Sequence, residues 1–200
     1  MFRIRVVALW AGLAAASASF AATAPGGAAP DFSIADTGGK PVRLADFRGK
    51  YVVLEWTNPE CPFVRAHYTS GVMPALQKEW GAKDVVWLAI NSTSASHPEY
   101  KTGRQMAEWM RAQNAAPLAT LIDGTSATGR AYAARTTPQM FVIDPSGKLI
   151  YEGAIDDRRS ADPADARAAN NYVRAALAEA TAGKPVSVAS TAPYGCSVKY

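Results

Sequence analysis

The sequence contains two cysteines, and the first of them stands where a thiol becomes reactive. Cys61 follows an apolar stretch and a short polar loop, and Pro62 opens a helical pattern directly after it. A thiol at the start of a helix lies near backbone N–H groups that have no partner within the helix, and near the positive end of the helix dipole. Both features favour the thiolate, which is the nucleophilic form of cysteine. The alternative is a buried structural thiol, a common role for cysteine.

Charged residues beside Cys61 are expected to act on this thiol. Arg65 lies four residues further along, on the same helical face, so its charge would favour the thiolate. Glu60 opposes this effect unless its carboxylate turns to solvent. His67 faces away from Cys61 at about 100° per residue. Unless Cys196 folds back, the ligand set of a Cys/His copper site is incomplete, so we expect neither a metal nor a cofactor.

Cys196 lies in a C-terminal segment that we expect to be mobile. Three roles are open to it: a resolving thiol that attacks oxidised Cys61, a permanent structural bridge with Cys61, or a spare thiol that pairs between chains. A permanent bridge would contribute about 5 kcal/mol in the chain-entropy model, but it would silence Cys61 as a nucleophile. We favour the redox-cycling pair, which needs both sulfurs accessible and the C-terminal segment able to move.

Strands and helices alternate along the chain after residue 30. Residues 51–56 are apolar except for Glu55, which predicts a buried central strand, and residues 61–80 have a helical pattern that Gly71 and Pro74 should break. The other expected elements are hairpins over 31–44 and 140–151, strands over 85–90 and 118–122, and helices over 98–113, 126–134 and 165–182. This order predicts an α/β fold with a mixed sheet covered by helices on both faces.

Four stretches carry a resemblance to known proteins: strand 51–56, TNPECPFVRAHY from Thr57, RTTPQ from Arg135 and MFVIDPSGKLIYEG from Met140. Together they resemble the thioredoxin-like superfamily, and within it the peroxiredoxin-like (alkyl hydroperoxide reductase/thiol-specific antioxidant, or redoxin) branch. The likeness covers about residues 30–183, and the ending YGCSVKY is similar to that of one group of periplasmic redoxins. It implies a thioredoxin-like fold: a mixed central sheet with helices on both faces, an N-terminal β-hairpin and a C-terminal extension.

The resemblance also implies roles around the nucleophile. Cys61 matches the nucleophilic cysteine, and Pro62 matches the proline that follows it in peroxiredoxins. Val64 stands where thioredoxins carry a second thiol, and Asn58 stands where peroxiredoxins carry threonine. The chain therefore departs from both templates, and Asn58, Pro62 and Arg65 are expected to line the substrate site.

Three further residues are matched by position. Pro138 matches the cis-proline that faces the cysteine, where the Thr137 backbone would contact an extended substrate; the alternative is a trans proline opening a strand. Glu55 matches a buried acid with a raised pKa that could exchange a proton with the thiol, or it is a strand-edge residue pointing to water. Arg135 could steady the Cys61 thiolate or a developing oxyanion, or it is a solvated surface arginine.

These residues together predict a thiol-dependent oxidoreductase of peroxiredoxin-like type with antioxidant activity. Cys61 attacks peroxide, Cys196 is the candidate resolving thiol, and an external thiol is the reductant. One alternative is thiol–disulfide exchange, with a protein disulfide as the substrate. Another is a non-enzymatic binding module or metallochaperone with a structural Cys61–Cys196 disulfide.

The N-terminus has the layout of a cleaved secretory signal. Arg3 and Arg5 precede an apolar run over 6–18, and small residues follow at Ser19 and Ala21. We expect a signal peptide over 1–21, a flexible leader over 22–30, the redoxin domain over 31–183, and an extension over 184–200 that carries Cys196. The alternative is an uncleaved anchor or a buried helix. Cleavage predicts a periplasmic or secreted protein in an oxidising compartment.

Composition and charge exclude several other classes. With 48% hydrophobic and 19% charged residues, the chain is neither a disordered nor a fibrous protein. The formal net charge is +4, and removing Arg3 and Arg5 leaves 4 − 2 = +2. So small a bias predicts no nucleic-acid partner and no stable membrane association after cleavage.

Overall fold

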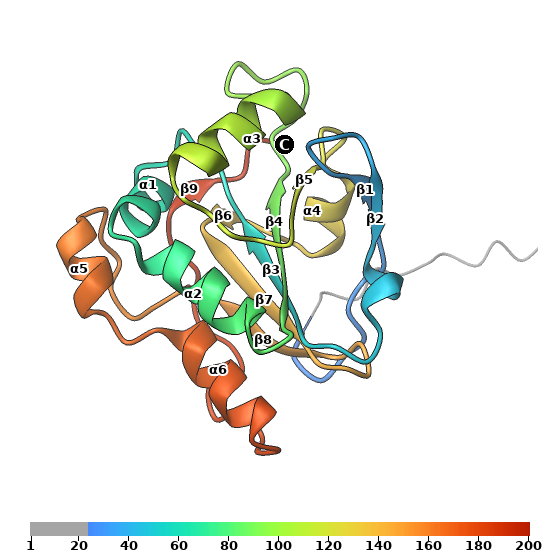
Figure 1. The fold of residues 1–200 in the computed structure, drawn as a ribbon, viewed down its shortest axis with the longest axis vertical. Helices are drawn as coiled ribbons and strands as arrows, with labels where there is room; N and C mark the ends of the chain where they lie inside the picture. Colours follow the sequence, from blue (N-terminus) through green and yellow to red (C-terminus); the bar gives the residue numbers. More distant parts are fainter. Residues whose placement is uncertain (1–23) are drawn as a thin grey trace, which may run out of the picture.

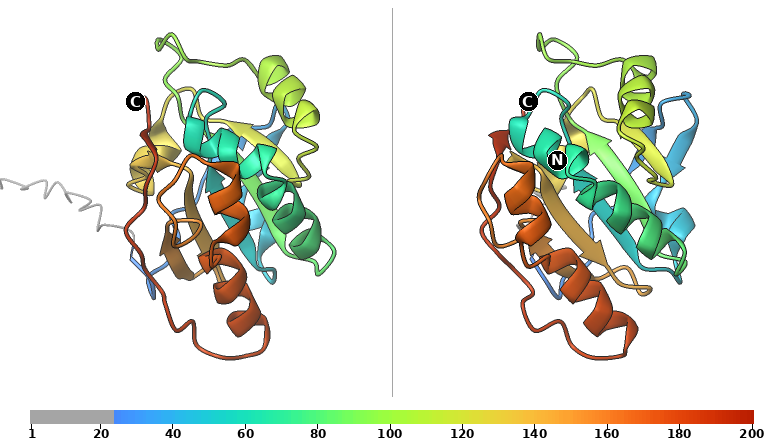
Figure 2. Two further views of the ribbon diagram at one scale, coloured as in Figure 1. Left: turned by 90° about the vertical axis from the view of Figure 1, so that its left-hand side faces the viewer. Right: turned by 60° about the vertical axis from the view of Figure 1, so that its left-hand side comes forward.

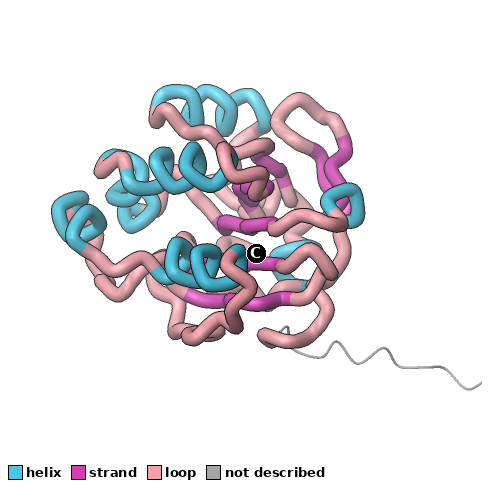
Figure 3. Tube along the Cα trace, turned by 60° about the horizontal axis from the view of Figure 1, so that its bottom comes forward, coloured by secondary structure: helices cyan, strands magenta, loops and turns pink. Residues whose placement is uncertain are grey.

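A computed structural model describes residues 24–200 of the chain. The predicted signal peptide over 1–21 lies outside the described residues and stays a prediction. Figure 3 shows strands of the central sheet lying between helices and loops. None of the helices within residues 24–200 combines the length and the apolar character that crossing a bilayer requires.

The centre of the fold is a five-stranded mixed sheet in the order β5–β4–β3–β7–β8 (Figure 1). Strands β3, β4 and β5 run parallel, whereas β7 pairs antiparallel with β3 and β8 pairs antiparallel with β7. Their bounds are β3 Val52–Trp56, β4 Val86–Asn91, β5 Ala119–Ile122, β7 Gln139–Ile143 and β8 Leu149–Gly153. Every residue of β3, β4 and β7 is buried, as expected for strands covered on both faces. The predicted mixed sheet is confirmed.

Helices cover one face of this sheet, and the N-terminal hairpin with shorter helices covers the other (Figures 1 and 2). The first layer comprises α1 Pro62–Thr69, α2 Val72–Gly81, α3 Gly103–Ala112 and α6 Tyr172–Thr181, with α5 Pro163–Ala168 beside α1. The second comprises the hairpin β1 Ser33–Ala35 and β2 Pro41–Arg43, the 3-10 helix η1 Leu44–Phe47, and α4 Ala127–Ala131. A separate two-stranded sheet pairs β6 Thr136–Thr137 with β9 Cys196–Ser197.

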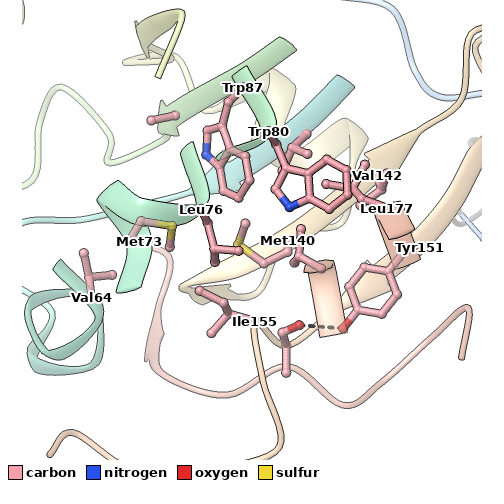
Figure 4. Packing of buried hydrophobic residues seen from close by; sticks show 14 of the residues in the cluster. Val64, Met73, Leu76, Trp80, Trp87, Met140, Val142, Tyr151, Ile155 and Leu177 are labelled. Atoms are coloured by element: carbon pink, nitrogen blue, oxygen red, sulfur yellow. Dashed lines mark hydrogen bonds between the residues drawn. The ribbon is translucent and has the colours of Figure 1, made fainter. Parts of the chain in front are cut away.

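The side chains of β3 alternate between two cores. Val53 packs with the helix-side cluster, whereas Leu54 and Trp56 pack with the cluster under the hairpin and α4. Figure 4 shows the helix-side cluster, in which Trp80 and Trp87 pack with residues from the sheet and from α6. This alternation decides that Glu55, two residues after Val53, points toward the helix-side core.

Two predicted helices differ from those observed. The helix expected over 165–182 is divided into α5 and α6, because Ala169 is extended and the Asn171 side chain caps a new helix by accepting from Arg174 N. The helix expected from residue 98 begins only at Gly103, where Thr102 forms a capping box with Gln105. The predicted break near Gly71 is confirmed: this glycine has φ +80° and starts α2.

Both ends of the described chain are held against the sheet, which differs from the predicted leader and mobile extension. Gly26 N donates to Leu149 O at 2.8 Å, and Ala29 N donates to Gly147 O at 3.0 Å. At the other end, Glu152 N donates to Ala189 O at 3.0 Å. The C-terminal segment returns from α6 along the length of the molecule to the end where α1 begins (Figure 2). Backbone pairing of this kind uses groups that every residue carries, so composition does not reveal it.

Candidate active site

Cys61 stands immediately before α1, as its sequence position predicts. It is the N-cap residue of that helix, and its backbone N–H donates to Asn58 O at 3.0 Å. Its side chain accepts no capping hydrogen bond; instead Sγ donates to Thr137 O at 3.0 Å. The residue is 1% exposed. The helix start is therefore confirmed, and the Cys61 sulfur is covered and accepts no hydrogen bond from the first N–H groups of α1.

The proline facing Cys61 is in the cis form, as predicted. The Thr137–Pro138 peptide bond is cis, and it directly follows Thr137, whose carbonyl contacts the Cys61 sulfur. Thr137 belongs to β6, which pairs antiparallel with β9 so that Thr137 lies opposite Cys196. The backbone edge expected to receive an extended substrate is thus occupied by the chain's own C-terminal strand.

The second cysteine lies beside the first. Both thiols are free in this structure, and Cys196 is partly buried. Burial, together with the neighbouring Cys61 thiol, raises the pKa of Cys196 to about 12, while Lys199 acts in the opposite direction. Cys196 is therefore protonated at neutral pH. Of the two thiols it is suited to act second, after Cys61 has been oxidised.

Glu55 is buried, so the alternative of a strand-edge residue in water does not apply. It is 0% exposed. Its carboxylate accepts from Tyr68 Oη at 2.7 Å, from Trp87 Nε1 at 2.8 Å and from Gln77 Nε2 at 3.0 Å. Burial raises its pKa, and these donors partly offset the rise. Within the described chain its hydrogen bonds reach α1 through Tyr68 rather than through Cys61.

The polar residues around the loop before Cys61 shape the loop itself. The Asn58 side chain accepts from Glu60 N at 2.9 Å and donates to Glu99 Oε2 at 2.8 Å. The Arg65 guanidinium donates to Pro59 O at 2.6 Å and pairs with Glu60 at 2.9 Å, so its hydrogen bonds go to the loop rather than to the Cys61 sulfur. The Glu60 carboxylate is paired with Lys101 at 2.7 Å as well as with Arg65, and the hydrogen bond from Lys101 is the largest cause that lowers its pKa. The nearest countercharge, rather than the shared helical face, decides the direction of Arg65.

Arg135 and Pro62 lie at the surface. The Arg135 side chain lines an open cavity of about 590 Å³ together with Arg130 and Tyr200, and neither cysteine lines that cavity. Arg135 is therefore a surface arginine, which is the second of the two roles considered for it above. Pro62 occupies the first position of α1, where its missing N–H costs no hydrogen bond.

Sequence reasoning missed a buried polar cluster between α1 and the C-terminal segment. His67 Nε2 lies 3.2 Å from Tyr194 Oη, and that hydroxyl donates to Asp156 Oδ1 at 2.5 Å. The prediction that His67 faces away from Cys61 agrees with this arrangement. Tyr194 is only two residues from Cys196, but no local pattern links it to a helix that ends far earlier in the chain.

Residues 24–200 contain no group of three or more potential metal ligands among His, Cys, Asp and Glu.

Comparison with known proteins places this architecture in a family. The model of the AhpC/TSA family matches residues 25–152. The chain belongs to the AhpC/TSA family. Membership agrees with the predicted redoxin branch, whose shared chemistry is that of thiol oxidoreductases. Among curated proteins, no relative matches the chain.

Solved structures extend the likeness beyond the family match. An uncharacterized conserved protein from Geobacillus kaustophilus is 28% identical with a TM-score of 0.77, covering 88% of this chain and 92% of that one. A hypothetical protein from Sinorhizobium meliloti is 25% identical with a TM-score of 0.74, covering 90% and 96%. A protein provisionally named thiol:disulfide interchange protein DsbE, from Chlorobium tepidum, is 27% identical with a TM-score of 0.54, covering 66% and 85%. The thioredoxin-like fold of this AhpC/TSA member is thereby confirmed.

Proposed function

We propose that this AhpC/TSA member is an exported thiol-dependent peroxidase of peroxiredoxin-like type. The Cys61 thiolate attacks a peroxide oxygen: an S–O bond forms, the O–O bond breaks, and the leaving oxygen takes a proton to become an alcohol or water. The Cys196 sulfur then attacks the sulfenic acid, an S–S bond forms, and water leaves. Two equivalents of an external thiol return the disulfide to the dithiol and are themselves oxidised to a disulfide.

The position of Cys196 carries this proposal. Thr137 is the partner of Cys196 in the β6–β9 pair, and its carbonyl contacts the Cys61 sulfur. A second thiol therefore lies at the candidate nucleophile, which supports a resolving role for it. Since Cys61 is buried, the proposal requires β9 to withdraw before peroxide enters and to return before the disulfide forms.

The remaining predicted site residues take supporting roles in this proposal. Asn58 shapes the loop that presents Cys61, and Pro62 begins the helix that directly follows Cys61. Glu55 ties β3 to α1 through the hydrogen bond that it accepts from Tyr68. Arg65 and Arg135, which are directed elsewhere in this conformation, would meet substrate only at the surface.

The test is peroxide consumption by the reduced protein with an external dithiol. The Cys61→Ser variant should be inactive. In the absence of the dithiol, the Cys196→Ser variant should consume about one equivalent of hydrogen peroxide and then stop, with a one-oxygen mass gain on Cys61. Serine at either position keeps size and polarity close to cysteine, so each variant is the matched control of the other. If the wild type consumes no peroxide and Cys61 gains no oxygen, the peroxidase proposal is wrong.

Thiol–disulfide exchange on exported proteins is the second candidate, favoured by the β6 edge beside Cys61. An extended strand already pairs with Thr137 next to the cis-proline, so a substrate strand fits there once β9 leaves. Cys61 would attack a substrate disulfide, forming a mixed disulfide and releasing one substrate thiolate. Cys196 would then attack the Cys61 sulfur, forming the Cys61–Cys196 disulfide and releasing the second substrate thiolate, and an external thiol would reduce that disulfide. The name of the Chlorobium tepidum neighbour agrees with this chemistry.

Scrambled ribonuclease A separates the two candidates. An exchange enzyme should restore ribonuclease activity, and its Cys196→Ser variant should accumulate a mixed disulfide at Cys61. A binding module should instead keep its function when both cysteines are serine. Export stays part of the proposal, and Edman sequencing of the mature protein checks it: the chain should begin at about residue 22.

A further inference from the structure

Tyr194 lies where the C-terminal segment meets the nucleophile's helix. Its ring packs edge-on against Phe63 with centroids 5.8 Å apart, and its side chain reaches His67, one turn further along α1. On its other side, the hydroxyl donates to Asp156 in the loop after β8. A single phenol thus ties the segment that carries Cys196 to the helix that begins after Cys61.

The cluster around the Tyr194 hydroxyl is closed to water. His67 and Asp156 are 1% and 2% exposed. Burial lowers the pKa of His67 to about 4, so the imidazole is neutral at pH 7. Its Nε2–H donates to the hydroxyl, which donates to Asp156 in turn. The other two polar atoms, His67 Nδ1 and Asp156 Oδ2, are 3.8 Å apart and have no hydrogen-bond partner, so the Tyr194 hydroxyl is the group that joins the two side chains.

The backbone between Tyr194 and Cys196 is held tightly, so fixing the Tyr194 side chain also fixes the position of the Cys196 sulfur. Gly195 has φ +130°, and a Cβ there would overlap Thr137 O. The backbone is therefore in tight contact with β6, and only glycine fits this path. Beyond Cys196, Val198 N donates to Arg135 O at 3.0 Å. Residues 194–198 thus form one continuous strap across Cys61.

We propose that the Tyr194 hydroxyl is the latch of this strap. Through its bonds to His67 and Asp156 it holds Cys196 over Cys61, so one contact both shields the nucleophile and positions its resolving partner. The inference rests on the proposed pairing of the two cysteines. Tyr194 is a positioning residue in this scheme, because it touches neither peroxide nor the reacting sulfurs.

Opposite effects on two thiol reactions distinguish a latch from a residue that only stabilises the fold. Tyr194→Phe keeps the ring and removes the hydroxyl. The iodoacetamide alkylation rate of Cys61 in the reduced protein should rise about tenfold or more, which corresponds to losing a hydrogen bond to a charged group. In a glutathione buffer, the equilibrium between the Cys61–Cys196 disulfide and the dithiol should shift toward the dithiol by a similar factor, with reduced glutathione oxidised in balance.

Tyr51→Phe is the matched control, because the Tyr51 hydroxyl donates to Ala180 O at 2.8 Å, away from the strap. It should change neither reaction. Hydrogen exchange reports where the structure opens: the amides of Val198 and of Ser94, which donates to Lys199 O, should exchange faster in Tyr194→Phe, while those of β3 keep their protection.

Two results would contradict the proposal that the Tyr194 hydroxyl is a latch. One is an alkylation rate and a glutathione equilibrium equal to those of the wild type. The other is a loss of protection that extends equally to β3, which would make Tyr194 a general stabilising residue. Neither reaction requires peroxide or a protein substrate, so failure of the latch and failure of the proposed oxidoreductase give different results.

Discussion

Glu55 is a buried carboxylate whose hydrogen-bond partners are all uncharged. Replacing it tests how much these hydrogen bonds contribute to the free energy of unfolding. Three donors converge on it, from Tyr68, Gln77 and Trp87. Glu55→Ala leaves all three without their acceptor in a buried site. At about 1–3 kcal/mol for each unsatisfied group, the cost is about 3–9 kcal/mol. A domain of this size has about 5–15 kcal/mol of stability, so the alanine variant should be largely unfolded.

Glu55→Gln should behave differently, because the amide preserves shape. Its oxygen can accept from Trp87 and Gln77, and its NH2 can donate to the Tyr68 hydroxyl. It also removes a charge from the interior. Burial raises the folded-state pKa of Glu55 above its ordinary 4.5, so the protonated acid is the form that folding favours. That stabilisation is fully present below the unfolded pKa and is lost as pH rises through the folded pKa. Each tenfold difference between the folded and unfolded acid dissociation constants corresponds to about 1.36 kcal/mol.

The expected result is a stability difference that changes with pH. The unfolding free energy of Glu55→Gln minus that of the wild type should rise from about pH 4 upward and level off above the folded pKa. Urea unfolding at a series of pH values, followed by tryptophan fluorescence, measures it. Glu108→Gln, at an exposed position on α3, is the control and should give a flat difference. A flat profile for Glu55→Gln would contradict a raised folded-state pKa of Glu55. An alanine variant as stable as the glutamine variant would contradict a stabilising role of the three hydrogen bonds.

Three further predictions concern the strap, a helix cap and the loop before α1. Gly195→Ala should displace β9 and speed alkylation of Cys61, whereas Gly183→Ala, also at positive φ but with open space around its Cβ, should not; equal rates in the two variants would contradict the close approach. Thr102→Ala removes the capping box of α3 and should lower the unfolding free energy by about 1 kcal/mol without changing peroxide consumption, as urea unfolding and the activity assay can check. Arg65→Met should leave the pH dependence of Cys61 alkylation unchanged, because its guanidinium is engaged elsewhere; a shifted profile would show that Arg65 does act on the thiol.

Much of the scaffold could be predicted from the sequence because its signals are local. The apolar run of β3, the glycine that separates α1 from α2, and the cysteine–proline pair at the start of α1 each act over a few residues. The cis form of Pro138 came from resemblance to a family and is confirmed in the structure. The division of the last helix was missed, because it depends on an asparagine cap whose signal is weak beside a long run of good helix formers.

Local sequence signals predict the central strands, most of the helices and the placement of Cys61 at a helix start, because side-chain periodicity and capping are short-range properties of the chain. In contrast, the position of Cys196 beside Cys61 and the pairing of Arg65 with Glu60 are visible only in the folded chain. Strand pairing between distant segments is made by backbone groups common to all residues, and a long charged side chain goes to whichever partner folding brings nearest. No local sequence pattern indicates the position of Cys196 or the direction of the Arg65 side chain. Both depend on where the folded core places the C-terminal strand and the loop before α1.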